Sequence, residues 1–570
     1  MPRKRDDIPA SISHLAPATG PTGQLAHPAA IEHLQRLERR LYKVGEHAWC
    51  LVGNGLSNQT FIEGPEGIIA IDTGESVEEM SSALRTLREH TQRPIVACIY
   101  THFHYVNGTE AILQEPGNRD LQIYAHAGIE DNLRRFGGEV APRSNRGLVH
   151  QFGTMLPKQG ADALLHCGLG QFLRNPDHAP FTPGYLPAQH QLTTTTQATI
   201  AGLQVTLTPA PSDASDSITI WFETLQLCVN NLIWPSLFNI FAIRGEEYRD
   251  PRRLLDGIDH IAALAPQHLL CTHGPPLSGT DISDAVIDYR DSIQFIWDQT
   301  VRGTNQGLTL DELTTRVQLP EHFQRSYFTQ QFYGLVEHHV RQIHSGLFGW
   351  FDEDESHLFP LPTAERCRRL IKGFGGRVKV RQQARAALTT ADYRWGLELA
   401  TWLVRSKGCT PRDRQLLADL LRATAQHTTS ANLRNWCLTR ALELEGKINL
   451  QRHRQHRFNP TQVLSAPPER FIDTLRVLLD PTLAAGLDAE LAWHFMGGAR
   501  TGLRVRNHVA ITTSGADADM TITLSQETWA ALLANTTTMS QCLELGTVSL
   551  AGDPEELMTF LKVFDVDGFR

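Results

Sequence analysis

The stretch PIVACIYTHFHYVNG, residues 94–108, is the clearest indication of the fold of this chain. It joins an apolar run to a loop in which two histidines are separated by one residue. The preceding segment, SVEEMSSALRTLREH (residues 76–90), has apolar positions at helical spacing and an acidic first turn. This order predicts a helix, then a strand, and then a histidine-rich loop at the end of that strand.

Further β-type runs lie on both sides of this stretch. Between residues 47 and 74, turn signals separate the strand candidates HAWCLVGN, SNQTFIEG and EGIIAIDTG. Between residues 121 and 276, the candidates are LQIYAHAG, QATIAGLQVTLTPAPS, SITIWFET, LQLCVNNL and HLLCTHGPP. Strands and helices in this alternation predict two stacked sheets with helices outside them.

The character of the chain changes twice after about residue 280. Amphipathic segments between residues 285 and 446 predict an all-helical domain. After the basic stretch QRHRQHRFNP, a helix followed by strand candidates predicts a small α+β domain. The expected organisation is a flexible leader or partner-binding arm (residues 1–30), the two-sheet domain (31–285), the helical domain (286–450) and the C-terminal domain (451–570).

The composition excludes several classes of function. Lys and Arg number 53 against 62 Asp and Glu, giving a net charge of −9, so a nucleic-acid partner is not expected. The nine cysteines are scattered, which is typical of free thiols in a reducing compartment. The chain shows neither a secretion signal nor an apolar run long enough to span a membrane. We therefore expect a cytoplasmic protein without stable membrane insertion.

The ends of the predicted strands carry metal-binding side chains. His102 and His104 follow one strand, and neutral imidazoles at this spacing can bind one zinc or iron ion. Asp72 ends another strand, and His273 follows a third. If these strand ends meet at one rim, they form a metal cleft. The alternative for His273 is a loop histidine that caps a helix or faces solvent.

The order of four segments identifies a family. IEGPEGIIAIDTG, YTHFHYVNG, CVNNLIWPSLFNIFAIRG and THGPP together resemble the alkyl sulfatase branch of the metallo-β-lactamase superfamily, the class III, zinc-dependent type that hydrolyses SDS. The likeness covers essentially residues 40–570. It implies an α/β metallo-β-lactamase αββα sandwich, then an all-α dimerisation domain, then a small α+β domain like a sterol carrier protein. It also implies a homodimer.

This chain departs from the family's metal site. Relatives hold two zinc ions through an HxHxDH motif, two acidic residues and a later histidine. The motif histidines match His102 and His104, but Val106 and Asn107 stand at the Asp and final His positions. The resemblance places the first acid at Asp213, replaces the second by Asn231 and keeps the later histidine as His273. We expect one ion at His102, His104 and Asp213, with His273 alone remaining of the second ion's protein ligands.

The resemblance also implies the reaction. Asn239 and Arg244 match residues that hold the sulfate group in relatives, and an Arg fork suits a tetrahedral anion. Asp213 and Asn231 are the candidate catalytic residues. We expect a metal-dependent hydrolase, with zinc as the family's metal, acting on a sulfate ester or a similar small, anionic, aliphatic ester.

Two other hypotheses remain open from the sequence. Two histidines and one carboxylate are also the ligand set of mononuclear non-haem iron(II) oxygenases. A non-catalytic relative that keeps the fold as a binding module would need no metal. In the C-terminal domain, the strands around Trp493, Phe495 and Val509 are compatible with either a ligand pocket or a plain core.

Overall fold

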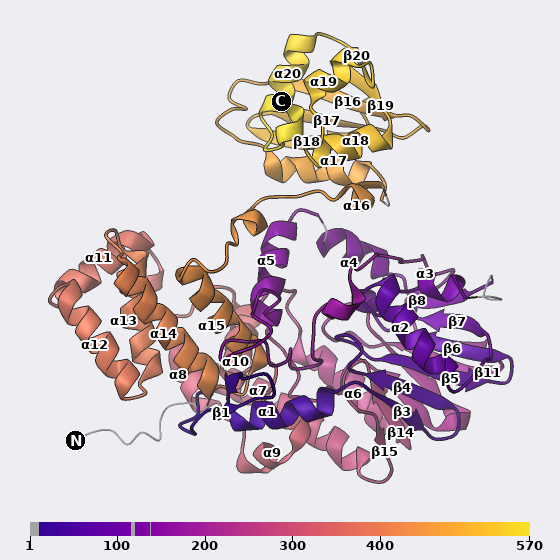
Figure 1. Ribbon diagram of the computed structural model, residues 1–570, viewed down its shortest axis with the longest axis vertical. Coiled ribbons are helices and arrows are strands. Elements are labelled where there is room, and N and C mark those ends of the chain that lie inside the picture. The colour runs from indigo at the N-terminus through magenta and orange to yellow at the C-terminus, as the bar shows by residue number, and fades with distance from the viewer. Residues whose placement is uncertain (1–10, 116–119, 137, 465) are drawn as a thin grey trace. The chain divides into compact units, whose positions relative to one another are not determined.

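The computed structural model describes residues 11–115, 120–136, 138–464 and 466–570. The chain divides into two compact units (Figure 1). The first comprises residues 1–132 and 146–450, and the second comprises residues 133–145 and 451–570. Residues 1–10 of the expected leader lie outside the described residues.

A seven-stranded sheet in the first unit contains the strand that precedes the two histidines. Its first four strands pair antiparallel, and β6, β7, β8 and β9 pair parallel. In sheet order the strands are β3 (Arg40–Val44), β4 (Ala48–Val52), β5 (Gln59–Gly64), β6 (Gly67–Ile71), β7 (Ile95–Ile99), β8 (Gln122–His126) and β9 (His190–Leu192).

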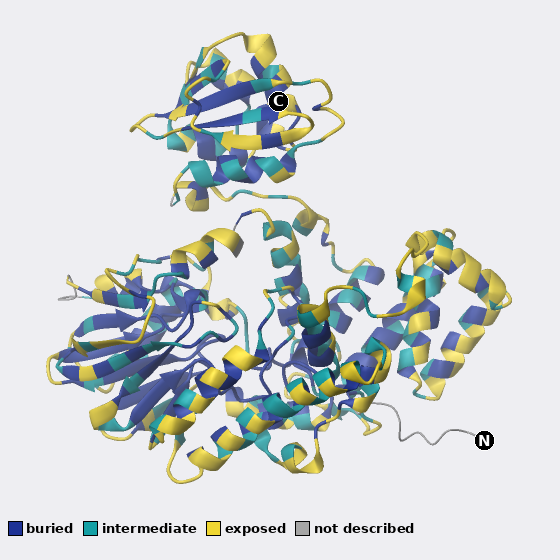
Figure 2. Cartoon of the chain, turned by 180° about the vertical axis from the view of Figure 1, so that it is seen from behind, coloured by how far each residue is buried: buried dark blue, intermediate teal, exposed yellow. Residues whose placement is uncertain are grey.

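A six-stranded sheet faces the first one. Its strands are β10 (Thr196–Ile200), β11 (Leu203–Pro209), β12 (Ile218–Phe222), β13 (Leu227–Asn230), β14 (His268–Cys271) and β15 (Leu277–Ser278). The core between the sheets takes side chains from both, such as Ile69 from β6 and Ile220 from β12. Figure 2 shows much of the sandwich interior as buried; in this sheet β12 and β13 are almost wholly buried, whereas β10 at the edge is largely exposed.

Helices cover the outer faces of both sheets. Helix α2 (Val77–Arg88) begins at the N-cap Ser76, whose hydroxyl accepts a hydrogen bond from the Glu79 amide, and lies beside β5 and β6 (Figure 1). Helices α6 (Pro251–Leu264) and α7 (Ile282–Asn305) share a buried cluster with β13 and β14. The predicted αββα sandwich is therefore confirmed.

Strand direction brings the polar strand ends to one rim. Strand β6 runs parallel to β7, and β13 runs parallel to β14. Strand β11 has the same direction as β13, because each pairs antiparallel with β12. Since the carboxyl ends of parallel strands share an edge, the loops after these strands converge.

The rest of the first unit is helical, as predicted. A group of helices formed by α11 to α15 lies apart from the sheets (Figure 1). The bounds are α8 (Leu310–Arg316), α9 (Glu321–Arg325), α10 (Val336–Phe348), α11 (Thr363–Gly373), α12 (Arg377–Thr389), α13 (Tyr393–Arg405), α14 (Pro411–His427) and α15 (Ala431–Leu444). Helices α1 (Pro28–Leu34) and α3 (Glu110–Leu113) also belong to the first unit, whereas α4 (Ile129–Phe136) and α5 (Ala141–Phe152) each contribute residues to both units.

The N-terminal stretch differs from the expected leader where the structure describes it. Strands β1 (Ala18–Thr19) and β2 (Leu25–Ala26) pair with each other, and helix α1 follows. The Leu25 amide donates to the carbonyl oxygen of Ala161, and Ala26 is fully buried. Backbone pairing and a small buried cluster therefore hold residues 18–34 within the unit, although their sequence has no apolar period.

The second unit is a small α+β domain, as predicted. Its five-stranded sheet has the order β18 (Val509–Thr513), β17 (Arg500–Arg506), β16 (Ala489–Phe495), β19 (Met520–Leu524) and β20 (Val548–Ala551). The helices are α16 (Pro460–Leu464), α17 (Glu469–Leu475), α18 (Gln526–Leu533), α19 (Met539–Glu544) and α20 (Pro554–Lys562). Trp493 and Phe495 pack in its core, whereas Val509 is about half exposed.

Across the described ranges, no helix is both long enough and apolar enough to cross a bilayer.

A buried charge cluster stabilises the helical part. The carboxylate of Asp413 is fully buried, accepts hydrogen bonds from Arg377 and Arg381, and closes a capping box with Thr410 at the start of α14. Burial raises the pKa of Asp413, but the hydrogen bonds from Arg377, Thr410 and Arg381 hold it at about 2. This carboxylate is therefore charged at neutral pH.

We predict that Asp413→Asn lowers the free energy of unfolding by about 3 kcal/mol, because it removes the charge that pairs with two arginines. This value is near the low end for a broken buried ion pair, since both arginines keep some exposure to water. The depressed pKa means that this stabilisation is present above about pH 4 and is lost as the pH falls toward 2. Thermal unfolding across this pH range checks both statements. Asp419→Asn, on the exposed face of the same helix, is the control, and an equal loss in both variants would contradict the prediction.

Candidate metal centre

Three predicted ligands meet at the rim. His102 follows β7 and Asp213 follows β11, so the loops after these strands bring His102, His104 and Asp213 together. Their ligand atoms all lie within 4.8 Å of one another. His102 Nε2 is 3.8 Å from Asp213 Oδ1, and His104 Nδ1 is 3.4 Å from Asp213 Oδ2. The carboxylate thus faces one nitrogen from each imidazole.

A hydrogen-bond chain orients His102. Asp72 accepts from both the amide and the hydroxyl of Thr101, at 2.8 and 2.6 Å. Because the Thr101 hydroxyl donates to Asp72, its oxygen must accept from His102 Nδ1, which lies 2.9 Å away. The Nδ1 nitrogen therefore carries the ring proton, and the Nε2 lone pair faces Asp213. Carboxylates that do not contact the metal themselves commonly orient metal-binding histidines in this manner.

The ligand set fits one divalent ion. His102 Nε2 is buried and has no hydrogen-bond partner among the residues that the structure describes, as expected of a nitrogen reserved for another ligand. Burial lowers the pKa of His102 to about 3, so the ring is neutral. Burial would raise the pKa of Asp213, but His102 and His104 hold it well below its usual value. Two imidazoles and one carboxylate are suitable ligands for zinc or iron.

Asn231 contacts this centre as a hydrogen-bond donor. Its Oδ1 atom accepts from the Thr272 hydroxyl at 2.5 Å and from Trp234 Nε1 at 3.2 Å. These two donors fix the orientation of the amide. Its NH2 group then donates to Asp213 Oδ1 at 2.7 Å and to Ser212 Oγ at 2.9 Å. Asn231 therefore holds the carboxylate and presents no acceptor to it.

The structure does not place His273 in the three-residue cluster. Its Nδ1 atom lies 3.1 Å from the carbonyl oxygen of Leu56, and its Nε2 atom lies 3.5 Å from the Tyr105 hydroxyl. His273 is 2% exposed, so the alternative of a solvent-facing histidine is wrong. Val106 is fully buried and has no ligand atom on its side chain. The residues at the second ion's positions do not fit a metal.

The two predicted anion-binding residues occupy different surroundings. Arg244 Nη2 lies 3.4 Å from His104 Nε2, and the guanidinium pairs with Glu246 at 2.5 Å. Asn239 is fully buried, and both its amide atoms have no hydrogen-bond partner among the described residues. A Cβ atom on Gly334 would come within 2.1 Å of Asn239 Oδ1, so this amide requires a glycine beside it. Arg244 thus borders the metal ligands.

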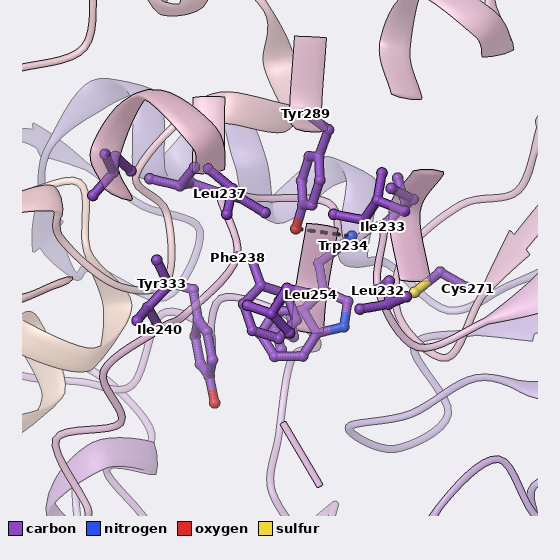
Figure 3. Packing of buried hydrophobic residues seen from close by; sticks show 14 of the residues in the cluster. Leu232, Ile233, Trp234, Leu237, Phe238, Ile240, Leu254, Cys271, Tyr289 and Tyr333 are labelled. Atoms are coloured by element: carbon purple, nitrogen blue, oxygen red, sulfur yellow. Dashed lines mark hydrogen bonds between the residues drawn. The ribbon is translucent and has the colours of Figure 1, made fainter. Parts of the chain in front are cut away.

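An aromatic wall closes the site on the side of α7. Trp234 stacks on Phe238 with ring centroids 4.3 Å apart (Figure 3). Its ring also meets that of His273 edge-on, with centroids 5.7 Å apart. The hydroxyl of Tyr289, on α7, lies 3.2 Å from the Trp234 amide nitrogen. Trp234 and Phe238 are at most 1% exposed, so this wall excludes water from the back of the site.

The sequence-based reasoning missed several residues of this centre. Thr101 and Tyr105 lie inside the quoted histidine motif, and Trp234 lies inside CVNNLIWP, but their contacts depend on the fold. Glu246 follows Arg244 by two residues, and this short spacing in the sequence could have indicated their ion pair.

Comparisons with known proteins agree with this architecture. The alkyl sulfatase dimerisation family model matches residues 309–447, and the alkyl sulfatase C-terminal model matches residues 458–568. A linear primary-alkylsulfatase from Pseudomonas sp. (strain ATCC 19151) is 32% identical over 532 residues, covering 89% of this chain and 98% of that protein. The alkyl/aryl-sulfatase BDS1 of Saccharomyces cerevisiae is 27% identical, covering 92% of this chain and 82% of that protein.

A solved structure extends the match to the fold. The stereoselective inverting sec-alkylsulfatase Pisa1 from Pseudomonas sp. is 25% identical and superposes with a TM-score of 0.83, covering 98% of this chain and 93% of that one. The agreement includes the sandwich, the helical part and the C-terminal domain. Together with the 32% identical relative, it shows that this chain belongs to the alkyl sulfatase family of hydrolases.

Proposed function

We propose that this protein hydrolyses the sulfate ester of a small aliphatic alcohol, using one divalent ion held by His102, His104 and Asp213. The observation that carries the proposal is the close approach of Arg244 to this ligand set, at 3.4 Å from His104. A cation site beside a buried guanidinium suits an ester whose leaving group is a sulfate anion. The relatives' names, linear primary-alkylsulfatase and alkyl/aryl-sulfatase, support this substrate class.

The chain's own residues prepare the centre for this chemistry. When bound, a divalent ion would act as a Lewis acid that polarises an ester oxygen and offsets developing negative charge. Asp72 and Thr101 hold the His102 ring in one tautomer. Asn231 holds the Asp213 carboxylate. Both ligands are thus oriented before any ion binds.

Arg244 supplies the positive charge for the sulfate group. Burial opposes its charge, but Glu246 and other nearby groups raise the pKa of Arg244, so the guanidinium stays protonated. Its planar N–H donors match the oxygens of a tetrahedral anion. We place Asn239 in the same role, because its buried amide has hydrogen-bonding capacity that no described residue uses.

We further propose a homodimer formed through an aromatic strap, defined as residues 348–361. The strap falls within the segment matched by the dimerisation model. It exposes large apolar side chains: Phe348, Trp350, Leu358, Phe359 and Leu361. Trp350 is 72% exposed and Phe359 is 94% exposed. A cluster of this kind is typical of a protein interface.

A cytoplasmic location is part of the proposal. All nine cysteines are free thiols, and all except Cys409 are buried. Free thiols in this number suit a reducing compartment.

A second candidate function comes from the composition of the cluster. Two histidines and one carboxylate, without a further ligand in the group, also match mononuclear iron(II) sites that use dioxygen. The identity of the bound metal and the consumption of oxygen separate this candidate from the hydrolase.

We predict that the protein purified and reconstituted with zinc contains one ion per chain and that His104→Ala loses it, because only one imidazole and one carboxylate remain. Elemental analysis of the dialysed protein checks this. His322→Ala, an exposed histidine outside the rim, should keep the ion. Preferential retention of iron(II) with oxygen uptake would favour the second candidate, and an unchanged metal content in His104→Ala would contradict the assigned ligands.

We predict that Arg244→Ala lowers kcat/KM for alkyl sulfates by about 10- to 100-fold, since a hydrogen bond to a charged group contributes about 1.5–3 kcal/mol. Arg244→Lys should recover part of the loss, because it keeps the charge without the fork. Sulfate release from linear primary and secondary alkyl sulfates is the measurement. Arg252→Ala, an exposed arginine paired with Asp250, is the control. Zinc-loaded protein that releases no sulfate from any of these esters would overturn the proposed function.

We predict that the double variant Trp350→Ser/Phe359→Ser shifts the protein from dimer to monomer at micromolar concentration, because it removes the apolar contacts proposed for the interface. Light scattering checks the mass. Leu545→Ser, which changes a 77% exposed leucine in the second unit, should remain dimeric. A wild-type monomer, or a double variant that stays dimeric, would be inconsistent with the strap as the interface.

A further inference from the structure

The ring of Tyr105 lies among the three histidines of the rim. Its centroid is 5.1 Å from that of His102, 5.9 Å from that of His104 and 5.5 Å from that of His273. Tyr105 is only 5% exposed, so the ring fills this space in place of water. The side chain that directly follows His104 therefore contacts the rings of all three histidines.

The Tyr105 hydroxyl faces the nitrogen that His273 would need for a metal. The carbonyl oxygen of Leu56 can only accept a hydrogen bond, so His273 Nδ1, 3.1 Å away, carries the ring proton. The Nε2 lone pair is then the one available ligand atom of this ring. It lies 3.5 Å from the Tyr105 hydroxyl, which donates a long hydrogen bond to it.

The amide of Asn231 makes the same region unsuitable for a cation. Its oxygen is turned away, toward Thr272 and Trp234, and its NH2 group points at Asp213. A cation bound on the Asn231 side of Asp213 would face the N–H donors of the amide, and Asn231 would offer it no negatively charged ligand. Reversing the amide would leave the buried Trp234 N–H without its acceptor, which is unfavourable inside a protein.

We propose that Tyr105 occupies the position at His273 that a second ion would require, and that its hydrogen bond to His273, together with the inward NH2 group of Asn231, makes this a one-ion centre. His273 is then a hydrogen-bond partner of Tyr105 and not a metal ligand. Val106 and Asn107 are consistent with this arrangement, because neither supplies an anionic ligand. The inference rests on the ion proposed above for His102, His104 and Asp213.

The test is the number of ions bound per chain. It compares two variants that restore ligands at the altered positions. The first is Val106→Asp/Asn107→His/Asn231→Glu, which keeps Tyr105. The second adds Tyr105→Ala. Cobalt(II) titration followed by absorption spectroscopy and elemental analysis measures the stoichiometry, and circular dichroism confirms that each variant is folded.

We expect one ion in the wild type, one in the triple variant and two in the quadruple variant, because only the last frees His273. His273→Ala in the wild-type background should keep its single ion. Two ions in the triple variant, loss of the ion from His273→Ala, or a folded quadruple variant with one ion would each overturn the inference. A wild type that binds one ion but releases no sulfate would contradict the proposed function and leave the Tyr105 assignment in place.

Discussion

The buried carboxylate of Asp213 is the charge on which the centre depends. A negative charge inside a protein is costly unless hydrogen bonds or opposite charges compensate it. Here the compensation comes from the chain itself, because the Asn231 amide and the Ser212 hydroxyl both donate to Asp213 Oδ1. Arg249, which is buried and donates to the Asn239 carbonyl oxygen, adds a nearby positive charge.

Because the chain itself compensates the charge of Asp213, the backbone conformation of the rim does not depend on a bound metal. The rim loops are positioned by strand pairing, since β6 with β7 and β13 with β14 form parallel pairs whose ends coincide. Contacts between loops further fix their positions, such as Thr101 with Asp72 and Asn58 with the carbonyl oxygens of Cys271 and Gly274. A scaffold held by such contacts can change individual ligands without losing its shape, which explains how Val106 and Asn231 are accommodated.

Much of this architecture could be predicted from the sequence. Apolar periods gave the helices and strands, and the strand-end positions of His102, His104 and Asp72 predicted a rim site, because strand direction follows from the alternation with helices. The N-terminal residues 18–34 were missed, since two-residue strands have no period. The roles of Tyr105, Trp234 and the Asn231 amide were also missed, because which atom of a side chain faces a site depends on partners distant in the chain.

Asn231 stands where relatives have a carboxylate. It shows that the residue types at ligand positions do not by themselves predict whether a second metal site is present. Counting ligands from the sequence left His273 as the remainder of a second metal site. The hydrogen bonds show a different state: Leu56 fixes the tautomer of His273, Tyr105 faces its free nitrogen, and Thr272 and Trp234 fix the amide of Asn231. At Asn231, the neighbouring side chains satisfy both ends of the substituted amide. In the proposed one-ion centre, the side of the rim at His273 is packed and hydrogen-bonded, and His104 has the most exposed side chain of the three ligands.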